Sequence, residues 1–152
     1  MIGEAQNAKW GVLFSPQVAD GAAFAANGYI DTLGWGYAEF LIQTGTLADT
    51  IGTTTASTAI VIEECETTGG TYTEIAAAVL AAAIAADGDD KLYKIDVNLQ
   101  NRTNKRYMRI KAPTAGSTGA GAYASALARL SKPMGVAPST ATERGLAANI
   151  LA

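Results

Sequence analysis

Apolar and polar residues alternate along several stretches of this chain, with the period of two that is typical of half-buried β-strands. Such stretches lie at 37–44, 106–111 and 122–130. The clearest is 91–99, where apolar side chains share one face and polar ones the other: Tyr93, Ile95, Val97 and Leu99 against Lys94, Asp96 and Asn98. We therefore predict a β-strand in each of these ranges.

A β-hairpin is the strongest local prediction, between residues 58 and 75. The range 58–66 holds an apolar run around Val61 that is followed by glutamates. Two glycines, Gly69 and Gly70, come next, and paired glycines favour the positive φ angles of a tight hairpin turn. The range 71–75 is the predicted return strand.

The alanine-rich run at 76–86 is ambiguous. Alanine has the highest helix propensity, which favours a helix. The run lies, however, between the hairpin and the polar turn at 87–90. One or two helical turns, a weak strand and an irregular connection therefore all remain open for this run.

Short strands separated by polar turns, without βαβ alternation, predict an all-β fold, an antiparallel β-sandwich or barrel. The length of 152 residues fits one domain. We divide the chain into an N-terminal arm with short strands at 1–28, a β-sandwich domain at 29–130 and a C-terminal tail at 131–152. Each end carries apolar residues that predict docking, with a frayed terminus as the alternative for the tail; they are Trp10, Phe14, Leu146, Ile150 and Leu151.

The composition narrows the possible functions. Charged residues make up 16% of the chain, against about 25% in typical domains, so Ser, Thr, Gly and Ala must cover much of the surface. The net charge of −3 argues against nucleic-acid binding, which needs a basic footprint. The chain has no His and one Cys, Cys65. This excludes His-based catalysis, Cys/His zinc sites and an internal disulfide.

Three remaining motifs resemble catalytic or ligand sites but lack essential parts. The glutamates at 63–66 would lie on one strand, whereas catalytic carboxylates converge from separate elements. The turn 87–90 begins like a calcium loop, but Lys91 and Asn98 occupy its fifth and twelfth positions. The glycine-rich segment 116–121 lacks the Lys-Ser/Thr pair of a phosphate loop. We therefore predict no metal, no cofactor and no enzymatic activity.

Basic residues concentrate between 102 and 111. Five of the eleven fall there: Arg102, Lys105, Arg106, Arg109 and Lys111. One interpretation is a patch that meets an acidic protein partner. The other, held equally, is a charged strand that pairs with the acidic strand at 63–66, since opposite charges across a ladder are favourable.

Residues 1–10 include Glu4 and Lys9 and have no apolar run, so we expect no secretory leader, and the alanine-rich run is too short to cross a bilayer. We therefore expect synthesis in the cytoplasm and no membrane partner.

Four motifs follow one another through the predicted strands: Val61-Ile62-Glu63-Glu64, Gly69-Gly70-Thr71-Tyr72-Thr73-Glu74-Ile75, Ile95-Asp96-Val97-Asn98-Leu99 and Lys105-Arg106-Tyr107-Met108-Arg109-Ile110. In order and spacing, the range 37–130 resembles the capsid decoration, or cement, proteins of tailed phages. The alanine-rich run, the arm and the tail depart from that resemblance.

The resemblance implies a jelly-roll-like sandwich on the outer surface of a virion, bound to the major capsid protein as a dimer or trimer. Together with the residues themselves, it implies partner contacts through the arm, the basic strand and the tail: Trp10, Phe14, Lys105, Arg106, Arg109, Lys111, Leu146, Ile150 and Leu151. The alternative is a host-surface or carbohydrate-binding module of a virion, whose aromatic face would draw on Trp10, Trp35 and Tyr37.

Overall fold

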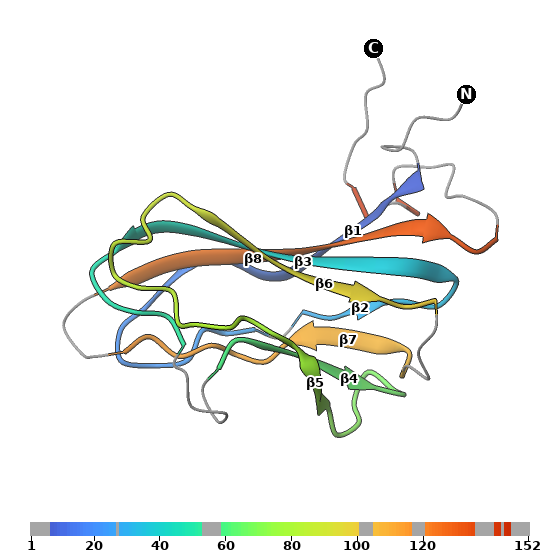
Figure 1. The fold of residues 1–152 in the computed structure, drawn as a ribbon, viewed down its shortest axis with the longest axis horizontal. Coiled ribbons are helices and arrows are strands. Elements are labelled where there is room, and N and C mark those ends of the chain that lie inside the picture. The colour runs from blue at the N-terminus through green and yellow to red at the C-terminus, as the bar shows by residue number, and fades with distance from the viewer. Residues whose placement is uncertain are drawn as a thin grey trace, which may run out of the picture.

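Eight β-strands form two four-stranded antiparallel sheets, which are stacked as two layers in the computed structural model (Figure 1). The structure describes residues 7–26, 28–52, 59–100, 105–116, 121–135, 142–143 and 145–146. In chain order the strands are β1 (Lys9–Ala19), β2 (Ile30–Asp31), β3 (Trp35–Leu47), β4 (Val61–Cys65), β5 (Thr73–Val79), β6 (Leu92–Asn98), β7 (Tyr107–Ile110) and β8 (Ala122–Pro133).

The strand order is β1-β8-β3-β6 in the first sheet and β2-β7-β4-β5 in the second. Consecutive strands thus pass repeatedly between the layers, and the result is the order of a jelly roll, an eight-stranded double sheet. The predicted all-β, jelly-roll-like sandwich is confirmed.

The core lies between the inner faces of the two sheets. Strand β8 has neighbours on both sides, and its inward positions are four alanines that are at most 5% exposed, followed by Leu130. Larger side chains lie directly beside these alanines, since Phe40 pairs with Ala128, and both Ile42 and Phe14 pair with Ala126. Alternation of small and large side chains lets the layer fill without voids.

The N-terminal segment contributes more than the short strands that its sequence predicted. Strand β1 has 11 residues and pairs with β8 along its length, with register shifts on either side of Phe14. Leu13 is 1% exposed. The ladder with β8 and the burial of Leu13 and Phe14 hold the segment in the sheet, although its apolar residues do not recur with a period of two.

The alanine-rich run is a strand followed by an irregular connection. Strand β5 extends to Val79, and the rest is held by an isolated bridge between Ile84 and Ile51. Ile75, Ala78 and Ile84 belong to the core. Tertiary burial therefore overrides the helix propensity of alanine.

The two ends of the sandwich differ. Strand β1 begins where β8 finishes (Figure 1), and we call this the terminal end. The ends of β2, β4 and β6 and the beginnings of β3, β5 and β7 also lie there, because all paired strands are antiparallel. The ends of β1, β3, β5 and β7 lie at the opposite end.

The alanine stripe of β8 predicts a large effect of added volume. Ala126→Leu should lower the free energy of unfolding by about 1–3 kcal/mol, because Ala126 is fully buried and packed on both sides. The matched control is Ala77→Leu on the exposed side of β5, which should change it little. Urea denaturation measures both, and equal effects would contradict this packing.

Candidate protein-interaction site

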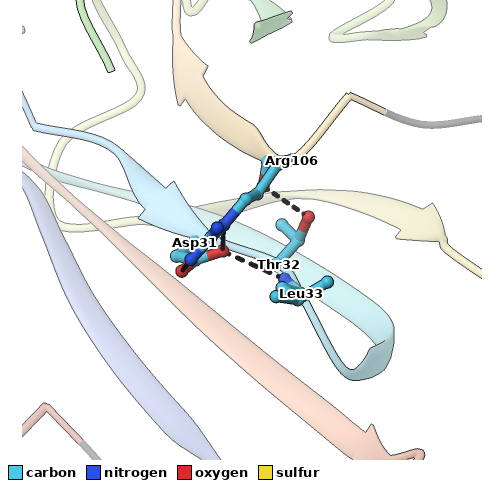
Figure 2. Close-up of polar contacts among 4 residues, drawn as sticks. All are labelled: Asp31, Thr32, Leu33 and Arg106. Carbon is cyan, nitrogen blue, oxygen red and sulfur yellow. Dashed lines mark hydrogen bonds and ion pairs between the residues drawn. The ribbon is translucent and has the colours of Figure 1, made fainter. Parts of the chain in front are cut away.

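The β2–β3 turn at the terminal end is fixed to the start of β7 by a compact set of polar contacts (Figure 2). The Arg106 guanidinium donates to both carboxylate oxygens of Asp31, with Nε–Oδ1 at 2.9 Å and Nη2–Oδ2 at 2.7 Å. The Thr32 hydroxyl and backbone N–H both donate to the Arg106 carbonyl, at 2.7 and 3.0 Å. Asp31 Oδ1 also accepts the N–H of Leu33 at 3.1 Å. The side chain and the carbonyl group of Arg106 therefore hold the first two residues of the turn, Asp31 and Thr32.

This fixed turn presents an apolar side chain to solvent. Leu33 is 67% exposed, and Met134, just after β8, is 63% exposed. The N–H of Met134 donates to the carbonyl of Gly34 at 2.8 Å, which ties the two segments together. Gly34 has a φ of 80°, in the left-handed region that glycine adopts without strain. Two large apolar side chains thus stand on a constrained backbone.

Leu33 and Met134 line an open cavity of about 330 Å³ together with Lys105, Arg106 and Glu66. Trp35 also lines this cavity and is itself 8% exposed. Methionine, arginine and aromatic residues are the types enriched at protein interfaces. We call this constellation the Leu33–Met134 site.

Electrostatics keep the ion pair of this site intact. The side-chain hydrogen bond from Arg106 lowers the pKa of Asp31 below its ordinary value, against the opposing effect of burial. The same hydrogen bond raises the pKa of Arg106. Both groups are therefore charged at neutral pH, and the turn keeps its geometry there.

The basic strand is paired with acidic neighbours. Strands β4 and β7 are adjacent, with Glu63 opposite Arg109 and Arg109 Nη2 at 3.0 Å from Glu63 Oε2. Lys111 Nζ lies 2.6 Å from Glu74 Oε1, and Lys105 Nζ donates to the Thr73 hydroxyl. Of the two interpretations, the structure shows the cross-strand pairing. A part for these basic residues in partner binding stays a prediction.

The apolar residues expected at the two ends have different surroundings. Phe14 is 3% exposed and its ring lies 5.4 Å from that of Phe24, which corrects its assignment as a contact residue: it fills the core. Trp10 is half-buried, with the Arg129 guanidinium 5.8 Å from its ring. Leu146 is half-buried, whereas Ile150 and Leu151 lie outside the described residues.

One described piece of the tail contacts the start of β1. Gly145 has a φ of 71°, and a Cβ at that position would collide with the carbonyl oxygen of Trp10. The tail residues 145–146 therefore lie at the terminal end, on the same side of the molecule as the Leu33–Met134 site. Close backbone contact of this kind favours glycine.

Leu33 and Met134 were missed by the sequence analysis. A single apolar residue in a turn such as Asp31-Thr32-Leu33-Gly34 has no periodicity to mark it. The useful signal was the turn itself, because an Asp whose side chain bonds the backbone two residues on is a recognised turn former. Leu33 is the third residue of that turn, so it lies between strands β2 and β3 rather than within one of them.

Comparison with known proteins supplies no relative: no family model, no curated protein and no solved structure matches this chain. Among the described residues, no group of three or more His, Cys, Asp and Glu could hold a metal ion. In the same part of the chain, no helix is long and apolar enough to cross a membrane.

Acid should release the β2–β3 turn. Since the pKa of Asp31 is lowered on folding, its stabilising effect is complete above the ordinary value of 3.8 and is lost as the pH falls through the folded-state pKa. Asp31→Asn should therefore lower the urea midpoint at pH 7, and the difference from the parent protein should shrink below about pH 4. Asp87→Asn, at the opposite end, is the control. If the difference in urea midpoint between Asp31→Asn and the parent protein did not change with pH, the stabilisation could not be assigned to the Asp31 carboxylate.

The Arg109–Glu63 pair should contribute more to stability than a more exposed ion pair. The Glu63 side chain is 11% exposed, so Arg109→Met leaves a nearly buried carboxylate without its partner and should cost about 1–3 kcal/mol of unfolding free energy. Lys94→Met breaks the pair between Lys94 and Asp96, whose side chains are 46% and 38% exposed. It also removes the longer contact of Lys94 with Glu39, but Glu39 keeps Arg129 at 2.7 Å, so the effect should be small. Urea denaturation of the two variants tests this, and the reverse order would refute it.

Proposed function

We propose that this protein is a capsid decoration, or cement, protein of a tailed phage that binds the lattice of major capsid protein through its terminal end. The observation that carries the proposal is the Leu33–Met134 site. Two exposed apolar side chains stand there on a turn fixed by Asp31 and Arg106, at the end where β1 begins and β8 finishes. The jelly-roll order and the motif resemblance across 37–130 support the same role.

The physical properties of the site suit attachment to another protein. Interface energy concentrates in a few well-placed side chains surrounded by contacts that exclude water. Because the turn is already ordered, Leu33 and Met134 would lose little backbone freedom on binding, which leaves more of their burial energy for affinity. The described tail residues 145–146 lie against Trp10 at the same end and would extend the contact surface.

Many copies on one lattice make modest contacts effective. Once several subunits of an oligomer engage neighbouring capsid proteins, the further contacts become intramolecular and the whole attachment outlasts any single contact. We propose a dimer or trimer at a symmetry axis of the capsid, since closed symmetric assemblies repeat one interface.

The test is binding of the purified protein to capsids that lack it. The parent protein should saturate the particles in a sedimentation assay, and Leu33→Ser combined with Met134→Ser should weaken binding at least about tenfold, as for the loss of an interface hot spot. The control is Leu92→Ser, since Leu92 is 64% exposed but begins β6, away from the terminal end. An absence of saturable binding, or an equal loss in the control, would overturn the proposal.

A further inference from the structure

A second cavity, of about 360 Å³, opens on the outer face of the first sheet near the opposite end. It has a structural cause. The β1–β8 register shifts between Phe14 and Gln17, so Pro16 lies beside the ladder and forms one wall. Ser125 and Gly45 are small residues that leave the floor open. The volume falls within the range of small-molecule sites, about 300–1,000 Å³.

One aromatic ring dominates this cavity. Tyr123 points outward from β8 and is 53% exposed. An added Cβ at Gly45 would come within 3.4 Å of the Tyr123 Cβ, so the glycine keeps the space beside the tyrosine clear. A tyrosine offers an apolar ring with a polar tip, which suits a ligand that is itself both apolar and polar.

Three uncharged or acidic groups surround the tyrosine: the Gln43 amide, the Ser125 hydroxyl and the Asp90 carboxylate. Within the described part of the chain, none of these three side chains has a hydrogen bond or an ion pair. No described residue that lines the cavity carries a positive charge. The lining therefore offers no cationic group to a phosphate or a carboxylate, and its one charged group, Asp90, would repel such an anion. Its amide and hydroxyl groups can accept hydrogen bonds from sugar hydroxyls and donate hydrogen bonds to them.

The loop that carries Asp90 is held in place by a buried side chain. The Thr44 hydroxyl donates to the Gly88 carbonyl at 2.6 Å and accepts the N–H of Lys91 at 3.0 Å. Asp89 accepts the N–H of Leu47 at 2.6 Å, and the N–H of Asp90 donates to the Gly45 carbonyl. Asp90 itself has a φ of 53°. The turn that looked like the start of a calcium loop thus positions a carboxylate at the cavity rim.

We propose that this cavity, the Tyr123 cavity, binds a neutral sugar residue of a glycan. The apolar C–H face of the sugar ring would lie against Tyr123. Its hydroxyls would donate to Asp90 and exchange hydrogen bonds with Gln43 and Ser125. The three aromatic residues first considered for this role are less available. Trp35 is 8% exposed, Tyr37 lies half-buried beneath the Lys132 ammonium, and Trp10 is half-buried with the Arg129 guanidinium near its ring.

The position of the cavity leaves it free while the terminal end is occupied. Val18, Gly45 and Tyr123 lie at the end of β1, near the end of β3 and at the start of β8, which all belong to the opposite end. A protein bound at the Leu33–Met134 site would therefore leave the Tyr123 cavity open. Sugar binding goes beyond capsid attachment and does not depend on it.

The experiment is a glycan array followed by ligand-observed NMR titration of the full chain with the neutral sugars that bind. A single shallow site predicts a dissociation constant of the order of 1 mM for a monosaccharide. Tyr123→Ala should weaken binding at least about tenfold, the order expected when one main contact group is lost. Asp90→Asn should also weaken it, and because asparagine tolerates a positive φ the loop should be retained.

The matched control is Tyr29→Ala, since Tyr29 is 45% exposed but packs edge-on against Tyr107 near the second sheet; sugar binding should be unchanged. Ser125→Leu fills the floor from an outward position and should block binding in a protein with an unchanged melting temperature. No saturable binding of any neutral sugar, or equal loss in Tyr29→Ala, would overturn the proposal.

The capsid assay separates this inference from the proposed function. Tyr123→Ala should bind capsids like the parent protein, and the Leu33→Ser, Met134→Ser variant should keep its sugar affinity. If Tyr123→Ala lost capsid binding and no glycan bound, the cavity would be a protein contact and the sugar site would be wrong.

Discussion

The structure depends on the burial of β8 between β1 and β3. This strand pairs with both neighbours, and its inward alanines are almost fully buried. Small side chains on the central strand make room for Phe14, Phe40 and Ile42 beside them. The N-terminal segment has a place in the sheet only because β8, more than a hundred residues later in the chain, provides its ladder.

The same pairing determines where the two surface sites lie. Because β1 begins where β8 finishes, the tail residues 145–146 and the β2–β3 turn both lie at the terminal end. The register shift of β1 past Phe14 creates the wall of the Tyr123 cavity toward the other end. The antiparallel pairing of β1 with β8 thus places the apolar site at one end of the sandwich and the Tyr123 cavity near the other.

Hydrogen bonds then fix a loop at each of the two sites. Asp31 and Arg106 join the β2–β3 turn to β7 across 75 positions of sequence, and Thr44 joins β3 to the turn before β6 across 44. In both cases a side-chain hydrogen bond between distant parts of the chain orders a loop that also carries exposed side chains. Loops ordered in advance suit recognition, because less conformational freedom is lost on binding.

By itself, the sequence determined the strands with a strict period of two, the pairing of β4 with β5 as a hairpin, and the absence of histidine chemistry. The tight turn expected at Gly69 and Gly70 was wrong, because β4 ends at Cys65, β5 begins at Thr73, and neither glycine has a positive φ. Alternation reports burial of one face directly, so Ile95 and Val97 could be assigned inward without a structure. Only the tertiary structure decided the state of residues 76–86, the core position of Phe14 and the partners of Arg106 and Arg109. It also revealed Leu33, Met134 and Tyr123 as exposed side chains on ordered backbone. The reason is that pairing between distant strands sets these environments, and neither propensity nor spacing along the chain specifies which strands meet.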